Sequence, residues 1–273
     1  DHVTICVESK ERTWELMIYP VVGGFRMISG KKGFFDGQPE AFSVEESEHA
    51  YIIRSKEHEM ILQKETLEIS IDRKAITNLK NISFIFEKES VSASRIQFSI
   101  HENSAIYGFG ERFDSVNQYG KTVALWQRDA CEGCLASIGN QAYKNIPLVH
   151  TSDGFSFFAN TSYRMRMDVG DAVQDYLSVE ALGDVFDFYI WSGTPREAMT
   201  AYGTLTGLPI FPPEWVFEPW AGGGGGRWRN GPLQDIALEQ MAAMKKFHEL
   251  DIPHSGFYAE GAGATFFVEY KKE

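Results

Sequence analysis

The feature that most constrains the fold is a series of short segments, rich in β-branched and aromatic residues, between residues 3 and 193. Many alternate between apolar and polar residues, and Gly, Pro, Lys or Glu separate them. The first group reads HVTICVES, TWELMIYP, GFRMISG, AYIIRS, MILQKETLEISI, NISFIFE and RIQFSI; the second reads PLVHTSD, GFSFFANTS, RMRMDVG, QDYLSVEAL and VFDFYIWSG. The pattern predicts two stacked antiparallel sheets, with Phe155, Phe157 and Ala159 on one face.

Between the two groups lies YGFGERFDSVNQYGKTVALWQRD, residues 107–129, which mixes glycines with aromatic and charged side chains. Neither a helical nor a strand period runs across it, so we expect a long loop. Loops held by a rigid scaffold often carry binding residues. Within this segment, Glu111 and Arg112 are expected to form a structural pair that steadies the base of the loop.

The pattern changes at residue 194. TPREAMTAYGTLTG has Thr194 at a helix N-cap position, Pro195 at the first helical position and Gly207 beyond the end, which predicts a helix. LPIFPPEW reads as a Pro-rich joint. After it come a short strand (WVFEPW), a glycine run, a helix (NGPLQDIALEQMAAMKKFHEL) and a second strand (HSGFYAEGAGA). This order is typical of a βαβ unit in a parallel sheet. Two parallel strands cannot cover their own faces, so we expect a truncated α/β domain.

The net charge and the cysteine content limit which partners, metals and cellular compartments we expect for this protein. The formal net charge of -12 argues against nucleic acid and anionic membranes as partners, and suits neutral or cationic ligands. No apolar run approaches the roughly 20 residues of a membrane-spanning helix, and no signal-peptide pattern follows Asp1. Cys131 and Cys134 form a lone Cys-x-x-Cys, and zinc needs about four ligands. We therefore expect no metal and no cofactor, with thiols that indicate a reducing, cytoplasmic compartment.

Several motifs, taken in order and spacing, resemble the N-terminal part of glycoside hydrolase family 31. They are YGFGERF, LWQRD, QAYKNIPLVHTSDGFSFFANTS, DVGD and FDFYIWSGTPREAMTAYGTLTGLPIFPPEW. The resemblance covers about residues 100–260 and is greatest to the α-xylosidase and α-glucosidase members. It implies a galactose-mutarotase-like antiparallel β-sandwich over residues 1–211, followed over residues 212–273 by the first βα units of a truncated (β/α)8 barrel.

The resemblance also implies a chemistry. Members of the family are retaining α-glycosidases, with some transglycosylases, and retention uses two carboxyl groups about 5–5.5 Å apart. In the family both are aspartates on later barrel strands, in motifs that do not occur before Glu273. We therefore expect no catalytic residue in this chain, and the remainder of the barrel as its partner. The alternative is a non-catalytic, carbohydrate-binding or structural β domain.

The resemblance implies site residues that contact an α-linked oligosaccharide or glycoside. Asp129, in LWQRD, is expected near the leaving-group side of the pocket, and Trp126 either anchors the loop or faces a sugar ring. Glu260 follows GFYA at a position where relatives usually have a sugar-binding Asp, and its extra methylene leaves the hydroxyl partners open. A carboxylate in such a place accepts two hydroxyl hydrogen bonds.

The first barrel loop, WAGGGGGRWRN, lacks the Gly-Lys-Ser/Thr ending of a phosphate-binding loop and the G-x-G-x-x-G context of a dinucleotide site. We expect its glycines to leave room at the barrel mouth, with Trp220 or Trp228 as a stacking face for sugar. Glu218 stands where relatives often have Gly, and it points either into the barrel or at the pocket.

Overall fold

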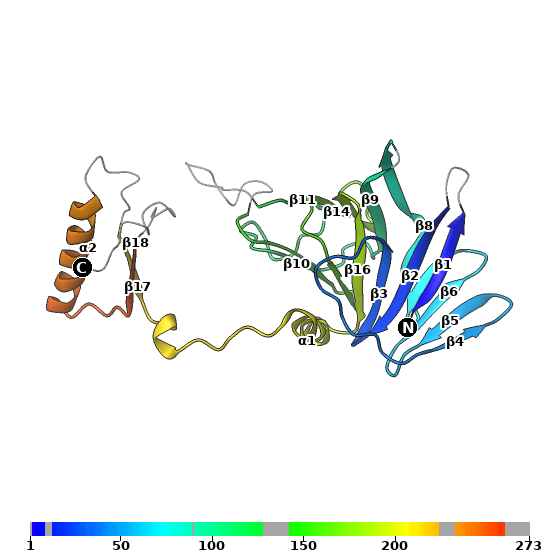
Figure 1. Cartoon of the computed structure of the whole chain (residues 1–273), viewed down its shortest axis with the longest axis horizontal. Helices are drawn as coiled ribbons and strands as arrows, with labels where there is room; N and C mark the ends of the chain where they lie inside the picture. Colours follow the sequence, from blue (N-terminus) through cyan, green and yellow to red (C-terminus); the bar gives the residue numbers. More distant parts are fainter. Residues whose placement is uncertain (1, 9–12, 89, 128–141, 224–232, 260–273) are drawn as a thin grey trace. The chain divides into compact units, whose positions relative to one another are not determined.

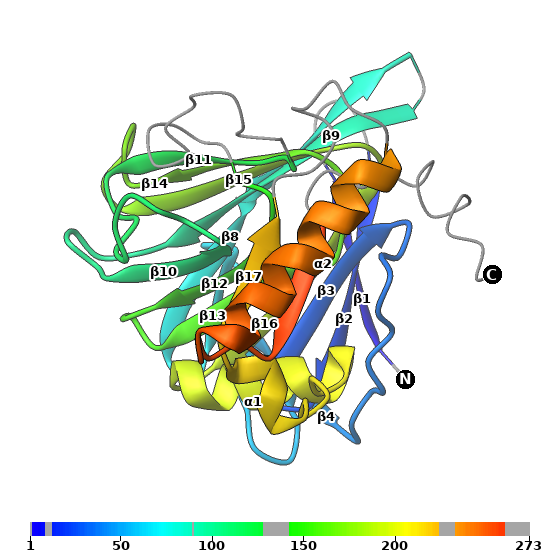
Figure 2. The same cartoon turned by 90° about the vertical axis from the view of Figure 1, so that its left-hand side faces the viewer.

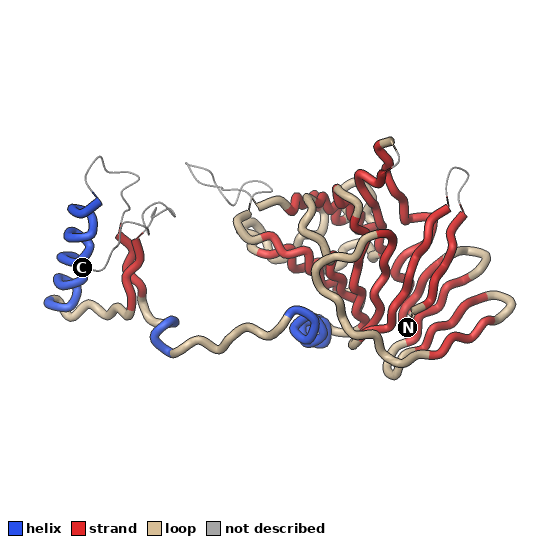
Figure 3. Tube along the Cα trace, viewed as in Figure 1, coloured by secondary structure: helices blue, strands red, loops and turns tan. Residues whose placement is uncertain are grey.

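The computed structural model describes residues 2–8, 13–88, 90–127, 142–223 and 233–259. The chain divides into two compact units, Asp1–Leu208 and Pro209–Glu273, and each is described by itself. The first unit is built almost entirely of antiparallel strands, and the second contains parallel strands and a helix (Figures 1 and 3).

The first unit contains two antiparallel sheets. The seven-stranded sheet has the order β1 (Val3–Glu8), β2 (Thr13–Val21), β3 (Gly24–Gly30), β16 (Val185–Ser192), β13 (Phe155–Ala159), β12 (Asn145–Thr151) and β10 (Ile106–Gly110). The nine-stranded sheet has the order β11 (Lys121–Leu125), β14 (Met165–Val169), β15 (Tyr176–Leu182), β9 (Ser90–Ser99), β8 (Lys74–Glu87), β7 (Glu68–Ile71), β6 (Glu59–Gln63), β5 (Ala50–Arg54) and β4 (Ser43–Glu46). Figure 2 shows the strands of the seven-stranded sheet side by side. The predicted antiparallel β architecture is confirmed.

The two sheets enclose one aromatic-rich core. Phe98 of the nine-stranded sheet stacks on Phe157 of the other sheet, with ring centroids 4.3 Å apart. Phe155, Phe157 and Ala159 all belong to this core, as the alternation of their strand predicts. Apolar side chains that alternate along both sheets thus remove one face of each from water, which is the main stabilising contribution in such a sandwich.

Helix α1 (Pro195–Thr206) covers part of the outer face of the seven-stranded sheet. Thr194 caps it, and Thr194 and Glu197 form a reciprocal capping box. At the other end Gly207, with φ of 90°, donates its N–H to the carbonyl of Gly203. The helix packs through Ala198 and Ala201 beside Phe158, Trp191 and Tyr189, which form a second apolar cluster. Strands β13 and β16 are therefore buried on both faces.

The mixed composition of residues 107–129 led us to expect one long loop, but two strands lie in this segment. Strand β10 begins at Ile106 and β11 at Lys121, and the two strands join different sheets. In β10, Gly108 and Gly110 adopt φ of 114° and 85°, and a Cβ at either would lie about 2 Å from a carbonyl oxygen of the β12 side. The buried Phe109 sits between them in a bulge. The bulge hides the strand period, and residues 111–120 form the loop between the two strands; residues 128 and 129 lie outside the described part of the chain.

Two further differences concern short strands. The segment MILQKETLEISI, predicted as one strand, is a hairpin of β6 and β7, because the chain reverses near Leu67 with φ of 63°. Strand β4, which the sequence pattern missed, is an edge strand whose four residues are all exposed. Because neither face of β4 is buried, its sequence does not need to alternate between apolar and polar residues.

The second unit contains a βαβ arrangement. Strands β17 (Trp220–Gly223) and β18 (Gly256–Ala259) pair in parallel, and helix α2 (Leu233–Glu249) connects them. The strand expected at WVFEPW begins only at Trp220, because Glu214–Phe217 form a 3-10 turn, η1, after Pro213. In α2, Met241 and Met244 of the predicted apolar face are exposed. No helix in the described part of the chain is long and apolar enough to cross a bilayer.

Candidate functional site

The first candidate region is the base of the segment that follows β11. Trp126 comes directly after β11 with its side chain half-exposed, and Gln127 forms an isolated bridge with Ala142. This bridge brings the two ends of the intervening segment together, just before β12 begins at Asn145. Asp129, which the resemblance implies as a sugar contact, lies outside the described residues.

The side chain of Arg112 holds the base of this segment together through hydrogen bonds. Its Nη2 donates to the Oδ1 of Asn145, 2.5 Å away, and to the carbonyl of Ala124, 3.1 Å away. Asn145 in turn donates from Nδ2 to the carbonyl of Ala142 at 3.0 Å. Burial lowers the pKa of the Arg112 guanidinium, and its Nε is buried without a partner among the described residues. The side chain therefore ties β11, the bridge at Ala142 and the start of β12 into one unit.

Glu111 acts separately at the same place. Its carboxylate pairs with the Nζ of Lys144 at 3.0 Å, and its backbone N–H donates to the carbonyl of Lys144 at 2.8 Å. Glu111 and Arg112 were expected to pair with each other. Instead, each binds a residue on the other side of the loop base. Both residues follow the end of β10 at Gly110, and their different partners lie at Lys144 and Asn145.

In the second unit, two predicted sugar contacts lie at the amino end of β17. Glu218 precedes the strand and accepts a hydrogen bond from the hydroxyl of Ser255. Trp220 is the first strand residue; its ring lies 5.5 Å from that of Trp215, and its Nε1 donates to the carbonyl of Val216 at 3.2 Å. Both side chains thus have partners within the second unit. Trp228 and Glu260 lie outside the described residues.

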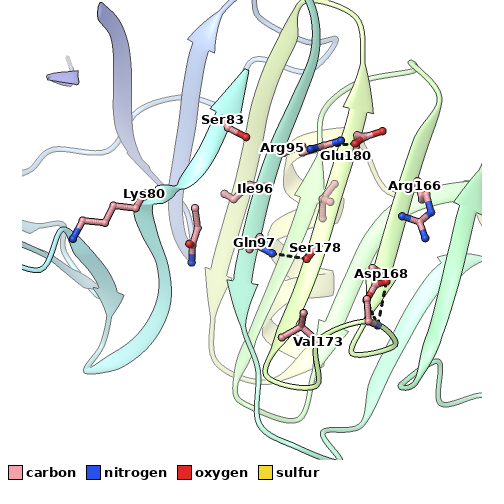
Figure 4. A pocket seen from close by; sticks show the side chains of 13 residues that line it. Lys80, Ser83, Arg95, Ile96, Gln97, Arg166, Asp168, Val173, Ser178 and Glu180 are labelled. Carbon is pink, nitrogen blue, oxygen red and sulfur yellow. Dashed lines mark hydrogen bonds and ion pairs between the residues drawn. The ribbon is translucent and has the colours of Figure 1, made fainter. Parts of the chain in front are cut away.

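A third region, which the sequence analysis missed, is a polar trough of about 400 Å³ on the outer face of the nine-stranded sheet (Figure 4). Its floor carries two cross-strand contacts between β9 and β15: Arg95 with Glu180, and Gln97 with Ser178 at 2.9 Å. One wall is a bulge in β8, where the register with β9 shifts between Thr77 and Ile82. The polar residues that alternate along β9, β14 and β15 were the available signal.

The opposite side of the trough is shaped by a turn after β14. Asp168 accepts hydrogen bonds from the backbone N–H groups of Asp171 and Ala172, both at 3.1 Å. The two carboxylates that line the trough, Asp168 and Glu180, are thus engaged within the protein, and no described lining residue is aromatic. This arrangement offers hydrogen bonds to solvent or a polar ligand, but no pair of free carboxylates for acid–base chemistry.

In the part of the chain that the structure describes, no group of three or more His, Cys, Asp or Glu side chains is arranged to hold a metal ion. Cys131 and Cys134 lie outside the described residues, and Cys6 is an exposed free thiol.

Comparison with known proteins gives a consistent picture. Residues 8–168 match the family model described as the glycosyl hydrolase 31 N-terminal galactose mutarotase-like domain. The chain is 34% identical over 185 residues to the α-xylosidase XylQ of Lactiplantibacillus pentosus, covering 67% of this chain and 23% of that protein. It is 25% identical over 226 residues to α-glucosidase 2 of Bacillus thermoamyloliquefaciens, covering 80% of this chain and 27% of that protein.

Among solved structures, the chain resembles a dextranase of Flavobacterium johnsoniae determined with isomaltotriose. The TM-score is 0.75 at 20% identity, and the match covers 95% of this chain and 33% of that one. At this identity the likeness concerns the fold. The chain spans about a quarter of the length of the two curated relatives named above.

Proposed function

The chain belongs to glycosyl hydrolase family 31, and from this we propose that it is the N-terminal portion of a retaining α-glycosidase that acts on α-linked xylose or glucose. The observation that carries the proposal is the match of residues 8–168 to the N-terminal domain of the family. The names of the relatives, an α-xylosidase and an α-glucosidase, supply the substrate class.

In this proposal, the β unit supplies a loop that reaches the sugar. The contacts of Arg112 and Glu111 at the loop base support this role, because a ligand-binding loop needs a rigid attachment. Asp129 accepts hydrogen bonds from sugar hydroxyls, and Trp126 offers a half-exposed ring beside it in the sequence.

The second unit, residues 209–273, is proposed as the beginning of the (β/α)8 barrel. Its parallel βαβ arrangement supports this, since the barrel is built by repetition of such units. Glu260 directly follows β18, and Trp228 lies in the segment after β17. Both positions follow the carboxyl ends of parallel strands, where barrel ligands bind. Among the predicted contacts of this unit, they are preferred to Glu218 and Trp220.

The catalytic carboxylates are proposed to come from the remainder of the barrel, outside residues 1–273. A retaining mechanism needs one carboxylate as nucleophile and a second as acid and base, about 5–5.5 Å apart. The sequence lacks the family motifs that bear them. Whether water or a sugar hydroxyl intercepts the covalent intermediate decides between hydrolysis and transglycosylation, and both products are to be measured.

The test uses the full-length protein and two variants. Aryl α-xyloside and aryl α-glucoside are the substrates. Asp129→Ala is expected to lower kcat/KM by roughly ten- to a hundredfold, since a hydrogen bond to a charged group contributes about 1.5–3 kcal/mol. The melting temperature should stay the same. Asp175→Ala, at an exposed position on the nine-stranded side of the β unit, is the matched control and should leave both quantities unchanged.

Three results would contradict the proposal. The first is an Asp129→Ala enzyme with kinetics within about twofold of the wild type. The second is hydrolysis by the 273-residue chain alone that a substitution within it abolishes. The third is a full-length protein that binds oligosaccharide without turning it over, which would favour the alternative of a non-catalytic carbohydrate-binding β domain.

A further inference from the structure

A buried polar network holds the connection between β3 and β4 against the outer face of the seven-stranded sheet. Arg26 and Asp187 form a bidentate pair there, and both are almost fully buried. Arg26 also pairs with Asp36 of the connection, and Asp187 accepts the backbone N–H of Gly33 at 2.7 Å. The connection is therefore attached to the sheet on both sides of residues 34 and 35.

The backbone of Phe35 is fixed at the same place. Its N–H donates to Oδ1 of Asn160 at 3.0 Å, and its carbonyl accepts from Nδ2 of Asn160 at 2.8 Å and from the hydroxyl of Tyr189 at 3.0 Å. Asn160 and Tyr189 are buried. Despite this rigid support, the neighbouring Phe34 side chain is 72% exposed. Because the backbone beside Phe34 is fixed and an aromatic side chain has only two side-chain torsions, Phe34 loses little conformational entropy when a ligand covers it.

A second exposed aromatic side chain, that of Tyr163, lies near Phe34. Tyr163 packs over Gly183, where an added Cβ would lie 2.5 Å from its ring, and its side chain is 44% exposed. Phe34 and Tyr163 line the same open groove of about 270 Å³. Phe35, Ile146 and Tyr202 contribute to its walls, and Gln127 lies beside them. Four parts of the β unit therefore line the groove: the connection between β3 and β4, the start of β12, helix α1, and Gln127 just after β11.

The lining of the groove has a distinct chemistry. Although 23% of the chain is charged, no described residue that lines the groove is charged. Aromatic and aliphatic residues line it together with the neutral polar residues Gln127, Asn145, Thr161 and Ser162. Apolar faces with a few placed neutral polar groups are typical of small-ligand sites. They suit a ligand that has apolar C–H faces, many hydroxyls and no charge.

We propose that this groove binds a neutral α-linked oligosaccharide, with sugar rings stacked on Phe34 and Tyr163 and hydroxyls bonded to Gln127. The substrate class rests on the proposed function, but the site lies wholly within the described β unit. The groove would give the β unit a carbohydrate-binding role of its own, next to the base of the loop that carries Asp129.

The test measures binding by the 273-residue chain, so its outcome does not depend on hydrolysis by the full-length protein. Native electrophoresis in gels that contain dextran reports binding as retardation, and free isomaltotriose is the competitor. Phe34→Ala and Tyr163→Ala should each weaken retardation by about three- to tenfold, the effect of losing one aromatic contact. Phe113→Ala is the matched control, because Phe113 is 59% exposed and does not line the groove. It should bind as the wild type does.

The chain must stay folded for the comparison to hold, and circular dichroism checks this. If Phe34→Ala fails to fold, Tyr163→Ala and Gln127→Ala decide. Absence of retardation in the wild type, or an equal loss in Phe113→Ala, would overturn the proposal. So would a concentration-dependent dimer that Phe34→Ala dissociates, because the occupant of the groove would then be a second copy of the chain. A negative result in this binding test does not affect the glycosidase proposal, which the kinetics of Asp129→Ala decide.

Discussion

The guanidinium of Arg26 and the carboxylate of Asp187 form a bidentate pair on the neighbouring strands β3 and β16, with Nε–Oδ1 at 2.8 Å and Nη2–Oδ2 at 2.7 Å. Burial alone would lower the pKa of Arg26, but its hydrogen bonds to Asp187 and Asp36 raise that pKa well above the ordinary value. The guanidinium therefore stays charged inside the protein, where it depends on the carboxylate oxygens that accept its hydrogen bonds.

The first prediction concerns this pair. Asp187→Ala leaves the Arg26 charge buried with Asp36 as its remaining carboxylate partner among the described residues, and loss of one member of a buried pair costs about 3–5 kcal/mol. Glu180→Ala is the matched control, since it removes the carboxylate of an exposed cross-strand pair with Arg95, and such pairs contribute less than about 1 kcal/mol. Urea unfolding of both variants checks this. Equal losses in the two variants would refute the distinction.

The second prediction compares two glycines. A Cβ at Gly33 would lie 1.6 Å from the carbonyl oxygen of Asn160, so Gly33→Ala must displace the connection that carries Phe34. We expect a loss of about 1–3 kcal/mol, as for overpacking elsewhere. Gly203 lies inside α1, where its Cβ would meet only the exposed Leu208 side chain. Gly203→Ala should stabilise by up to about 1 kcal/mol. Thermal unfolding measures both, and destabilisation by Gly203→Ala would contradict the second part.

The third prediction concerns the N-cap of α1. The hydroxyl of Thr194 accepts from the N–H of Glu197, and the carboxylate of Glu197 accepts from the N–H of Thr194. Thr194→Ala should cost about 1 kcal/mol, and Thr194→Ser should cost much less because it keeps the acceptor oxygen. Chemical unfolding of the two variants provides the comparison. If Ser and Ala are equally destabilising, the capping hydroxyl is not the source of the effect.

The fourth prediction concerns acid stability. Burial opposes ionisation of Asp114, but hydrogen bonds from Lys121, Gln118 and the Ser115 backbone hold its pKa far below the ordinary value. Because the folded-state pKa is the lower one, ionised Asp114 stabilises the fold above the unfolded pKa of about 3.9, and this contribution is lost as the pH falls further. Asp114→Asn should therefore be less stable than the wild type near neutral pH, and the difference should shrink below about pH 4.

Urea unfolding across this pH range measures the effect, since the difference in free energy between the two proteins isolates the carboxylate. Lys121→Met removes the cation and should reduce the same pH dependence. A difference between wild type and Asp114→Asn that stays constant down to about pH 2.5 would show that the carboxylate does not carry it.

Local signals predicted some elements closely. The helix begins after Thr194 and ends before Gly207, as the caps indicate, because capping depends on a few adjacent residues. The strands around Phe157 follow their alternation for the same reason. Strands β10 and β11 escaped prediction: β10 is interrupted by a bulge, and both lie in the segment whose mixed composition predicted a loop.

The candidate site was predicted only in outline. The sequence indicated candidate binding residues within 107–129, but not the fact that Arg112 would bind Asn145, 33 residues away, instead of Glu111. It also gave no sign that Glu218 and Trp220 would lie at the amino end of β17 with partners of their own. The start of a strand within WVFEPW depends on the turn after Pro213, which the apolar pattern does not report.

By itself, the sequence determined the strand-rich character of the first unit, the change of pattern near residue 194 and the family, because periodicity, caps and motifs are properties of neighbouring residues. Only the tertiary structure decided which strands share a sheet and which side chains meet. Arg26 and Asp187 are 161 residues apart, and Phe34 and Tyr163 line one groove from separate connections. Such contacts form because burial of apolar faces selects one pairing of strands, and that choice depends on the whole chain at once.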